Sequence, residues 1–178
     1  MTELTDYFKV WFSHVAACFD PETGEKIEDD NPHTIWAKTA AAHPGAFIVL
    51  AFLVEKPANL AWSEILTNLK GQGYVRVLVA ATASPGTPKK RPATETDAPL
   101  SARRIDDLLQ EKAPLAGQSR LFIAQDRVTV AETERSRFLE AAEAALHFGH
   151  GQVYLFSGDT FVPAGHYSRG LHSPKTGR

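Results

Sequence analysis

Apolar residues recur at helical spacing at the start of the chain, which predicts an amphipathic helix over residues 3–16. The residues of this stripe are Leu4, Phe8, Trp11, Phe12 and Val15. The run Asp20–Gly24 has the composition of a turn and ends the segment. Asn31 then fits a helix N-cap with Pro32 at the first helical position, which predicts a second helix up to about Ala42.

Four segments further along have the composition of strands: Ala46–Val54, Tyr74–Ala80, Arg120–Val130 and Gln152–Phe156. The first is continuously apolar, which predicts a central strand. Two helices are predicted between the strands from apolar residues at helical spacing. One is lined by Leu60, Ile65, Leu66 and Leu69, and the other by Phe138, Leu139, Ala142 and Leu146.

The order of elements is strand–helix–strand, repeated once, which predicts an α+β fold. We expect a four-stranded, mostly antiparallel sheet with the helices on one face, in a split βαβ-like layout, preceded by the N-terminal helix. Residues 83–117 contain five of the eleven prolines, so we expect a mobile insertion with one short helix near residues 101–110. The expected organisation is leading helices in 1–45, an interaction domain in 46–157 and a return segment in 158–178.

Composition and charge narrow the class of protein. The 178 residues are 43% apolar and 22% charged, which is typical of a globular chain and excludes wholesale disorder. The net charge of −2 argues against a general affinity for nucleic acids or membranes. The single cysteine, Cys18, excludes an internal disulfide and fits a cytoplasmic protein. No apolar run has the length of a membrane span.

The chemistry of the side chains leaves two alternatives open. His147 and His150 are three residues apart, and with His166 and His172 they could hold zinc in a small hydrolase that uses Asp126 or Asp159. Because Gly149 ends the helix between the first two and no cysteine supports them, we expect no metal site. Lys89, Lys90 and Arg91 could instead contact phosphate in a stand-alone nucleic-acid-binding module. No phosphate-binding loop or catalytic serine motif is present.

A pentapeptide of the same form occurs near both ends of the chain. Asp20–Gly24 and Ser173–Gly177 each read small polar residue, Pro, any residue, Thr, Gly. This is the outline of a zinc knuckle, C-P-x-C-G, with both cysteines replaced. One carboxylate and three hydroxyls cannot close a structural zinc site, so we expect two knuckle-like turns without metal that lie side by side.

Six segments in order together resemble the UvrA family of excinuclease proteins and cover nearly the whole chain. TELTDYFKVWFSHV resembles the family's approach to its first zinc module, and DPETGEKI occupies the place of the knuckle. The other four are PHTIWAKTAAAHPGAFIVLAFLV, KGQGYVRVLV, QDRVTVAETERSRFLEAAEAAL and FVPAGHYSRGLHSPKTGR. The first of these resembles the family's helix and strand ahead of its UvrB-binding domain, the next two resemble segments that follow, and the last resembles the return into the second knuckle. The cysteines are lost, and Val54–Asn59 replaces a basic stretch, which indicates a divergent paralogue.

The resemblance implies a piece of a twin ABC-type ATPase that surveys DNA for damage in nucleotide excision repair. This chain would then be a non-catalytic, UvrB-binding-type interaction domain without a cofactor of its own. ATP and DNA would bind the parent protein, and a UvrB-like protein would be the partner. The resemblance marks Arg76 and Arg127 as partner-facing. If Val75 and Val77 face the helices, Arg76 points to the open face of the sheet.

Overall fold

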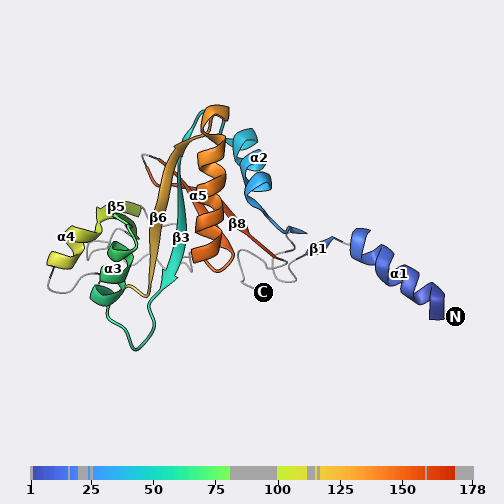
Figure 1. Ribbon diagram of the computed structural model, residues 1–178, viewed down its shortest axis with the longest axis horizontal. Coiled ribbons are helices and arrows are strands. Elements are labelled where there is room, and N and C mark those ends of the chain that lie inside the picture. The colour runs from blue at the N-terminus through green and yellow to red at the C-terminus, as the bar shows by residue number, and fades with distance from the viewer. Residues whose placement is uncertain are drawn as a thin grey trace.

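The computed structural model describes residues 2–15, 17–19, 24, 26–80, 100–111, 115, 117–158 and 160–170 (Figure 1). The helices are α1 (Thr2–Val15), α2 (Pro32–Ala42), α3 (Trp62–Gly71), α4 (Ile105–Gln110) and α5 (Arg135–Phe148), with a short 3-10 turn, η2 (Glu132–Glu134). The strands are β1 (Cys18–Phe19), β2 (Lys26–Ile27), β3 (Phe47–Glu55), β4 (Arg76–Ala80), β5 (Leu100–Arg104), β6 (Arg120–Thr129), β7 (Gln152–Ser157) and β8 (Pro163–Ser168).

The main sheet has six strands in the order β5-β4-β6-β3-β7-β8, and every neighbouring pair is antiparallel. The α+β class is therefore confirmed, but the predicted number of four strands is wrong. The two additional strands, β5 and β8, are the edges of the sheet. β1 and β2 form a separate two-stranded ribbon.

The continuously apolar segment is a central strand, as predicted. β3 lies between β6 and β7, and both of its long sides are hydrogen-bonded. Its inner residues Ile48, Val49, Leu50 and Ala51 are at most 1% exposed. The register between β3 and β6 shifts between Leu50 and Ala51, whose partners are Asp126 and Ala124, so Gln125 is the extra residue of a bulge.

The two faces of the sheet have different coverings. The larger core joins one face to apolar side chains of helices α2 to α5, among them Trp36, Leu66, Leu108 and Phe138. In Figure 1, α5 lies across the sheet on this side. The opposite side, called the far face below, carries a smaller core formed by Val49, Ala51, Leu78, Leu100 and Phe156. No described helix contributes a residue to that smaller core.

The second helix has the start and the end that the sequence predicts. The Asn31 side chain accepts hydrogen bonds from the backbone N–H groups of His33 and Thr34, each at 3.0 Å. Thr34 Oγ1 in turn accepts from the Asn31 backbone N–H at 2.9 Å, which completes a capping box. Trp36 then packs edge-on against Phe138 of α5 at 5.1 Å between ring centroids.

The predicted opening helix is present as α1, which projects away from the sheet in Figure 1. Phe8, Trp11 and Phe12 of its stripe lie outside both apolar cores and are 52–58% exposed. Among the described residues, no helix combines the length and the apolar character that crossing a bilayer requires.

Part of the expected mobile insertion is regular structure, and this corrects the prediction for residues 100–110. Leu100–Arg104 pairs with β4, and only Ile105–Gln110 is helical. Residues 81–99, including Lys89, Lys90 and Arg91, lie outside the described residues. So do Thr23 and Ser173–Gly177, on which the expected meeting of the two knuckle-like turns depends. The division of the chain at residues 45 and 157 stays a prediction; α2 packs on α5, and β8 pairs with β7.

Candidate docking surface

Arg76 lies at the start of β4, and its direction follows from the alternation of the strand. Val77 and Val79 belong to the core beneath the helices, whereas Leu78 belongs to the far face. Because successive side chains of a strand point to opposite faces, Arg76 shares the far face with Leu78. It is exposed, and among the described residues it forms no ion pair.

Arg127 lies on the same face but is held in place. It is the register partner of Val49, which belongs to the far-face core. Its Nη2 donates to the carbonyl oxygen of Gly158 at 3.0 Å, and its guanidinium lies 4.8 Å from the ring centroid of Phe47. Its Nε is buried without a hydrogen-bond partner among the described residues, which is a costly arrangement for a donor. Arg127 is therefore a fixed anchor rather than a freely solvated side chain.

The register places the two arginines near each other along the sheet. Val77 pairs with Ile123, so Arg76 is level with Ala124 on the adjacent strand β6. Arg127 is three residues further along β6, beyond the bulge at Gln125. The two predicted site residues therefore share one face and neighbouring strands. Their role in binding stays a prediction.

A third arginine, Arg104, was not among the predicted site residues. It is the register partner of Arg76 on the edge strand β5 and is exposed. Local composition does not reveal it, because Leu-Ser-Ala-Arg-Arg lacks the β-branched and aromatic residues that indicate a strand. A prediction of β5 together with its pairing to β4 would have revealed this position.

Asp126 faces the opposite way and pairs with α5 instead of with its neighbour Arg127. Arg137 donates from Nε and Nη2 to the two carboxylate oxygens of Asp126, at 2.7 and 2.8 Å. Arg127 contributes only its backbone N–H, at 2.7 Å. Partial burial opposes ionisation of Asp126, but these hydrogen bonds and the charge of Arg137 outweigh it and lower the pKa of Asp126.

The histidines that could have formed a metal site are spread over the structure. His147 packs edge-on against Phe148 near the end of α5, and His150 follows the helix with a positive φ of 52°. His166 on β8 stacks on Tyr154 at 3.9 Å, and burial lowers its pKa to about 4. His172 and Asp159 lie outside the described residues. Within the described ranges, no three His, Cys, Asp or Glu side chains are grouped as metal ligands.

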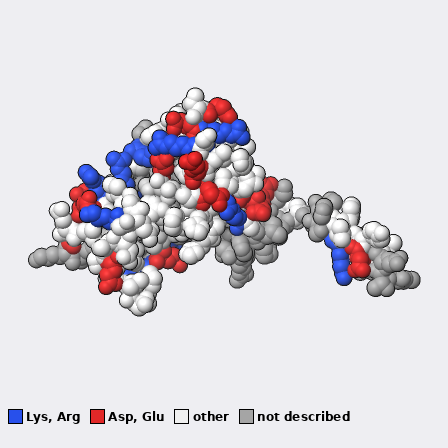
Figure 2. Space-filling view, in the orientation of Figure 1, with Lys and Arg blue, Asp and Glu red and all other residues white. Residues whose placement is uncertain are grey.

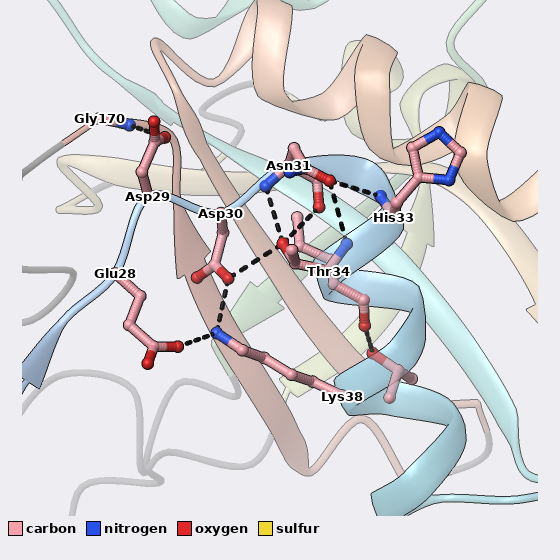
Figure 3. A network of polar contacts seen from close by, with 10 residues as sticks. Glu28, Asp29, Asp30, Asn31, His33, Thr34, Lys38 and Gly170 are labelled. Carbon is pink, nitrogen blue, oxygen red and sulfur yellow. Dashed lines mark hydrogen bonds and ion pairs between the residues drawn. The ribbon is translucent and has the colours of Figure 1, made fainter. Parts of the chain in front are cut away.

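A polar network joins the point where the chain reaches the sheet domain to the point where it leaves (Figure 3). The backbone N–H of Asp30 donates to Ser168 O at 3.0 Å, and Gly170 N donates to Asp29 Oδ1 at 2.7 Å. Lys38 of α2 binds Asp30 at 2.6 Å and Glu28 at 2.7 Å. We call these residues the neck network; it fixes residues 28–30 beside residues 168–170.

Charges on the visible surface are mixed in sign. Figure 2 shows acidic and basic side chains interspersed over the face that carries α5. Arg137 and Asp126, and Arg169 and Glu143, are ion pairs of this kind. Such a surface does not attract a polyanion as a whole, so any charged partner must be recognised by local groups.

Comparisons with known proteins relate the chain to a single type of protein. The chain is 23% identical to UvrABC system protein A of Deinococcus radiodurans over 175 residues, which is 98% of this chain. It is 26% identical to UvrABC system protein A of Thermus thermophilus over 90% of the chain, and 26% identical to that of Aquifex aeolicus over 87%. No family model matches the sequence.

The similarity extends over nearly all of this chain but only a small part of those relatives. The chain spans about 15% of the length of the proteins from D. radiodurans and T. thermophilus, and 14% of the one from A. aeolicus. The chain is therefore similar to one segment of UvrABC system protein A.

Proposed function

We propose that this chain is a non-catalytic interaction domain of the UvrB-binding type, within a UvrA-like protein of nucleotide excision repair. The parent protein would be an ABC-type ATPase that binds ATP and DNA, and a UvrB-like protein would dock on this domain. The observation that carries the proposal is the similarity to UvrABC system protein A over 98% of the chain.

The geometry of the far face supports a docking role. Arg76 and Arg127 lie on one face and on adjacent strands, and arginine forks form bidentate hydrogen bonds with carboxylates. Leu78 and Val49 share this face but are at most 1% exposed, so they form a packed base beneath the two arginines. Arginine is one of the residue types that carry most of the binding energy in protein interfaces.

The test is a titration of the chain with UvrB from the same organism. We expect Arg76→Ala to weaken binding by roughly thirtyfold, which corresponds to about 2 kcal/mol for an anchor at the centre of an interface. Arg127→Ala should weaken binding at least as much, because it removes both the guanidinium and its packing on Phe47. Calorimetry or biolayer interferometry gives the dissociation constants.

Arg135→Ala serves as the matched control, since Arg135 lies on α5 and pairs with the exposed Glu132. It should leave the affinity unchanged. Binding that survives both far-face substitutions would remove these residues from the site. An absence of binding by the parent chain at high micromolar concentration would contradict the proposed partner.

A further inference from the structure

Two arginines lie directly opposite each other at the edge of the sheet. Arg76 of β4 and Arg104 of β5 are register partners. Ile105 N donates to Val75 O at 2.9 Å, so the adjacent pair, Arg76 and Arg104, is a non-hydrogen-bonded pair. In such pairs the Cα atoms are only about 4.5 Å apart and the side chains leave the same face in closest proximity.

Like charges placed directly opposite across two strands are destabilising. Other cations nearby have carboxylate partners: Arg103 binds Glu111, Arg120 binds Glu55 at 3.2 Å, and Lys70 binds Asp106 at 2.6 Å. Asp106 also interacts with Arg104 through its charge, but its hydrogen bond is with Lys70. Within the described part of the chain, neither Arg76 nor Arg104 forms an ion pair of its own.

We propose that Arg76 and Arg104 together form an anion-binding site for a carboxylate-bearing segment of a protein partner. The site rests on the proposed docking function and adds Arg104 to it. Two guanidiniums that repel each other in the free chain bind one acidic segment more strongly than either would alone, because the bound carboxylates also relieve the repulsion. Arg104 is on an edge strand, where an incoming segment has access to one side.

An acidic protein segment fits this site better than nucleic acid does. The neighbours of the pair along the two strands on the same face are Leu78 and Ala102, which are register partners. Leu78 is buried, and its register partner on β6, the half-buried Phe122, packs edge-on against Tyr154 and Phe156, so this ring is already engaged and does not present a free face on which a base could stack. The chain also carries a net charge of −2, which gives no general attraction for a polyphosphate.

The first experiment is a titration of the chain and its variants with UvrB from the same organism. Arg104→Gln should lower the affinity about tenfold or more, as Arg76→Gln does. The double variant should lose much less than the product of the two single losses, because the two side chains act as a unit. Arg103→Gln is the control, since Arg103 is the next residue on the same strand but points to the helix-covered face and binds Glu111.

The second experiment separates this site from the identity of the partner. A hexaglutamate peptide is titrated into the parent chain, and the arginine Nε–H signals are followed by NMR, with a twelve-residue oligothymidine titrated in parallel. Shifts at the Nε–H signals of Arg76 and Arg104 with hexaglutamate, together with shifts of backbone amides on β4 and β5 that the double variant no longer shows, would support the site even if UvrB does not bind. In that case the proposed partner would be wrong and the site would stand.

Three results would overturn the inference. One is an affinity for UvrB that Arg104→Gln leaves unchanged, together with no shift on adding hexaglutamate. The second is binding of the oligothymidine in preference to the acidic peptide. The third is a Tm of Arg104→Gln that is lower than the Tm of the parent chain. Removing one of two repelling charges should raise the Tm. A lower Tm would therefore mean that Arg104 stabilises the fold.

Discussion

The carboxylate of Asp126 is next to Arg127 in the sequence, yet it is Arg137 on α5 that binds it. Removing this bidentate pair with Arg137→Gln should lower the free energy of unfolding only modestly at pH 7, because the pair is partly exposed and solvent screens it. Since the folded state lowers the pKa of Asp126, its contribution is complete above the unfolded pKa of about 3.9. The contribution is lost as the pH falls through the folded pKa.

Urea unfolding of the parent and of Arg137→Gln at a series of pH values tests this expectation. The two unfolding curves should be separated at neutral pH and converge in acid, once the pH lies below the lowered folded pKa of Asp126. Arg135→Gln is the control, because its partner Glu132 is 73% exposed and the pair adds little at any pH. A separation that grows toward acid would contradict the assigned pair.

The direction of a side chain could be predicted from the sequence, but its neighbours could not. The prediction for Arg76 depended on Val75 and Val77 facing the helices; Val77 lies in the core beneath them, whereas Val75 is 49% exposed and belongs to neither core. Arg104 could not be found, because it becomes relevant only through the register of β5 against β4. The contact of Arg127 with Phe47 likewise joins two strands that are distant in sequence. Cross-strand register depends on the pairing of whole strands, which local composition does not encode.

At the scale of elements, α2 and α3 begin differently. Asn31 caps α2 through two backbone N–H groups, whereas Ala61, in the same extended conformation before α3, has no side chain that can cap. Asn31→Ala should therefore destabilise the protein by about 1 kcal/mol. Ala61→Ser should stabilise it by roughly 0.5 to 1 kcal/mol, because the introduced hydroxyl would form a capping box with Glu64 at the third helical position.

Guanidinium unfolding measures both effects, and each variant is a control for the other. The midpoints should shift in opposite directions with an unchanged dependence on denaturant. Shifts of the same sign would show that the caps do not determine the stability of these helices.

The helices were the most predictable elements, and the edge strands were the least. Apolar spacing and the Asn-Pro start were sufficient for α2 because a helix closes its hydrogen bonds locally. β5 lacks β-branched and aromatic residues, and β8 contains Pro163 and Gly165, residue types that are rare in strand interiors. Both are strands because a neighbour supplies the hydrogen bonds on one side. Charged residues and proline on the edge strands also protect the sheet against pairing with strands of other chains.

At the scale of the whole molecule, the neck network determines where the sheet domain is attached. Asp30 and Glu28 bind the same ammonium group of Lys38, but the side chain of Asp30 is 8% exposed and that of Glu28 is 42% exposed. Asp30→Ala should lower the free energy of unfolding by about 2 kcal/mol, as expected for a buried hydrogen bond to a charged group. Glu28→Gln, the matched control, should change it by less than about 1 kcal/mol.

Urea unfolding compares the two variants, and hydrogen exchange at the amide of residue 30 reports on the bond to Ser168. Exchange at that amide should become faster in Asp30→Ala and stay unchanged in Glu28→Gln. Equal losses of stability in the two variants would show that burial of Asp30 is unimportant.

Residues 28–30 and 168–170 are hydrogen-bonded to each other. In any longer chain that contains this domain, the backbone therefore enters and leaves the domain at nearly the same point. A short loop of a few residues could bridge that gap, and closing such a loop costs little entropy. The domain can therefore be gained or lost by a single excision without displacing what precedes and follows it. During evolution the domain can be inserted, replaced or deleted as a unit while the fold of the surrounding protein is retained.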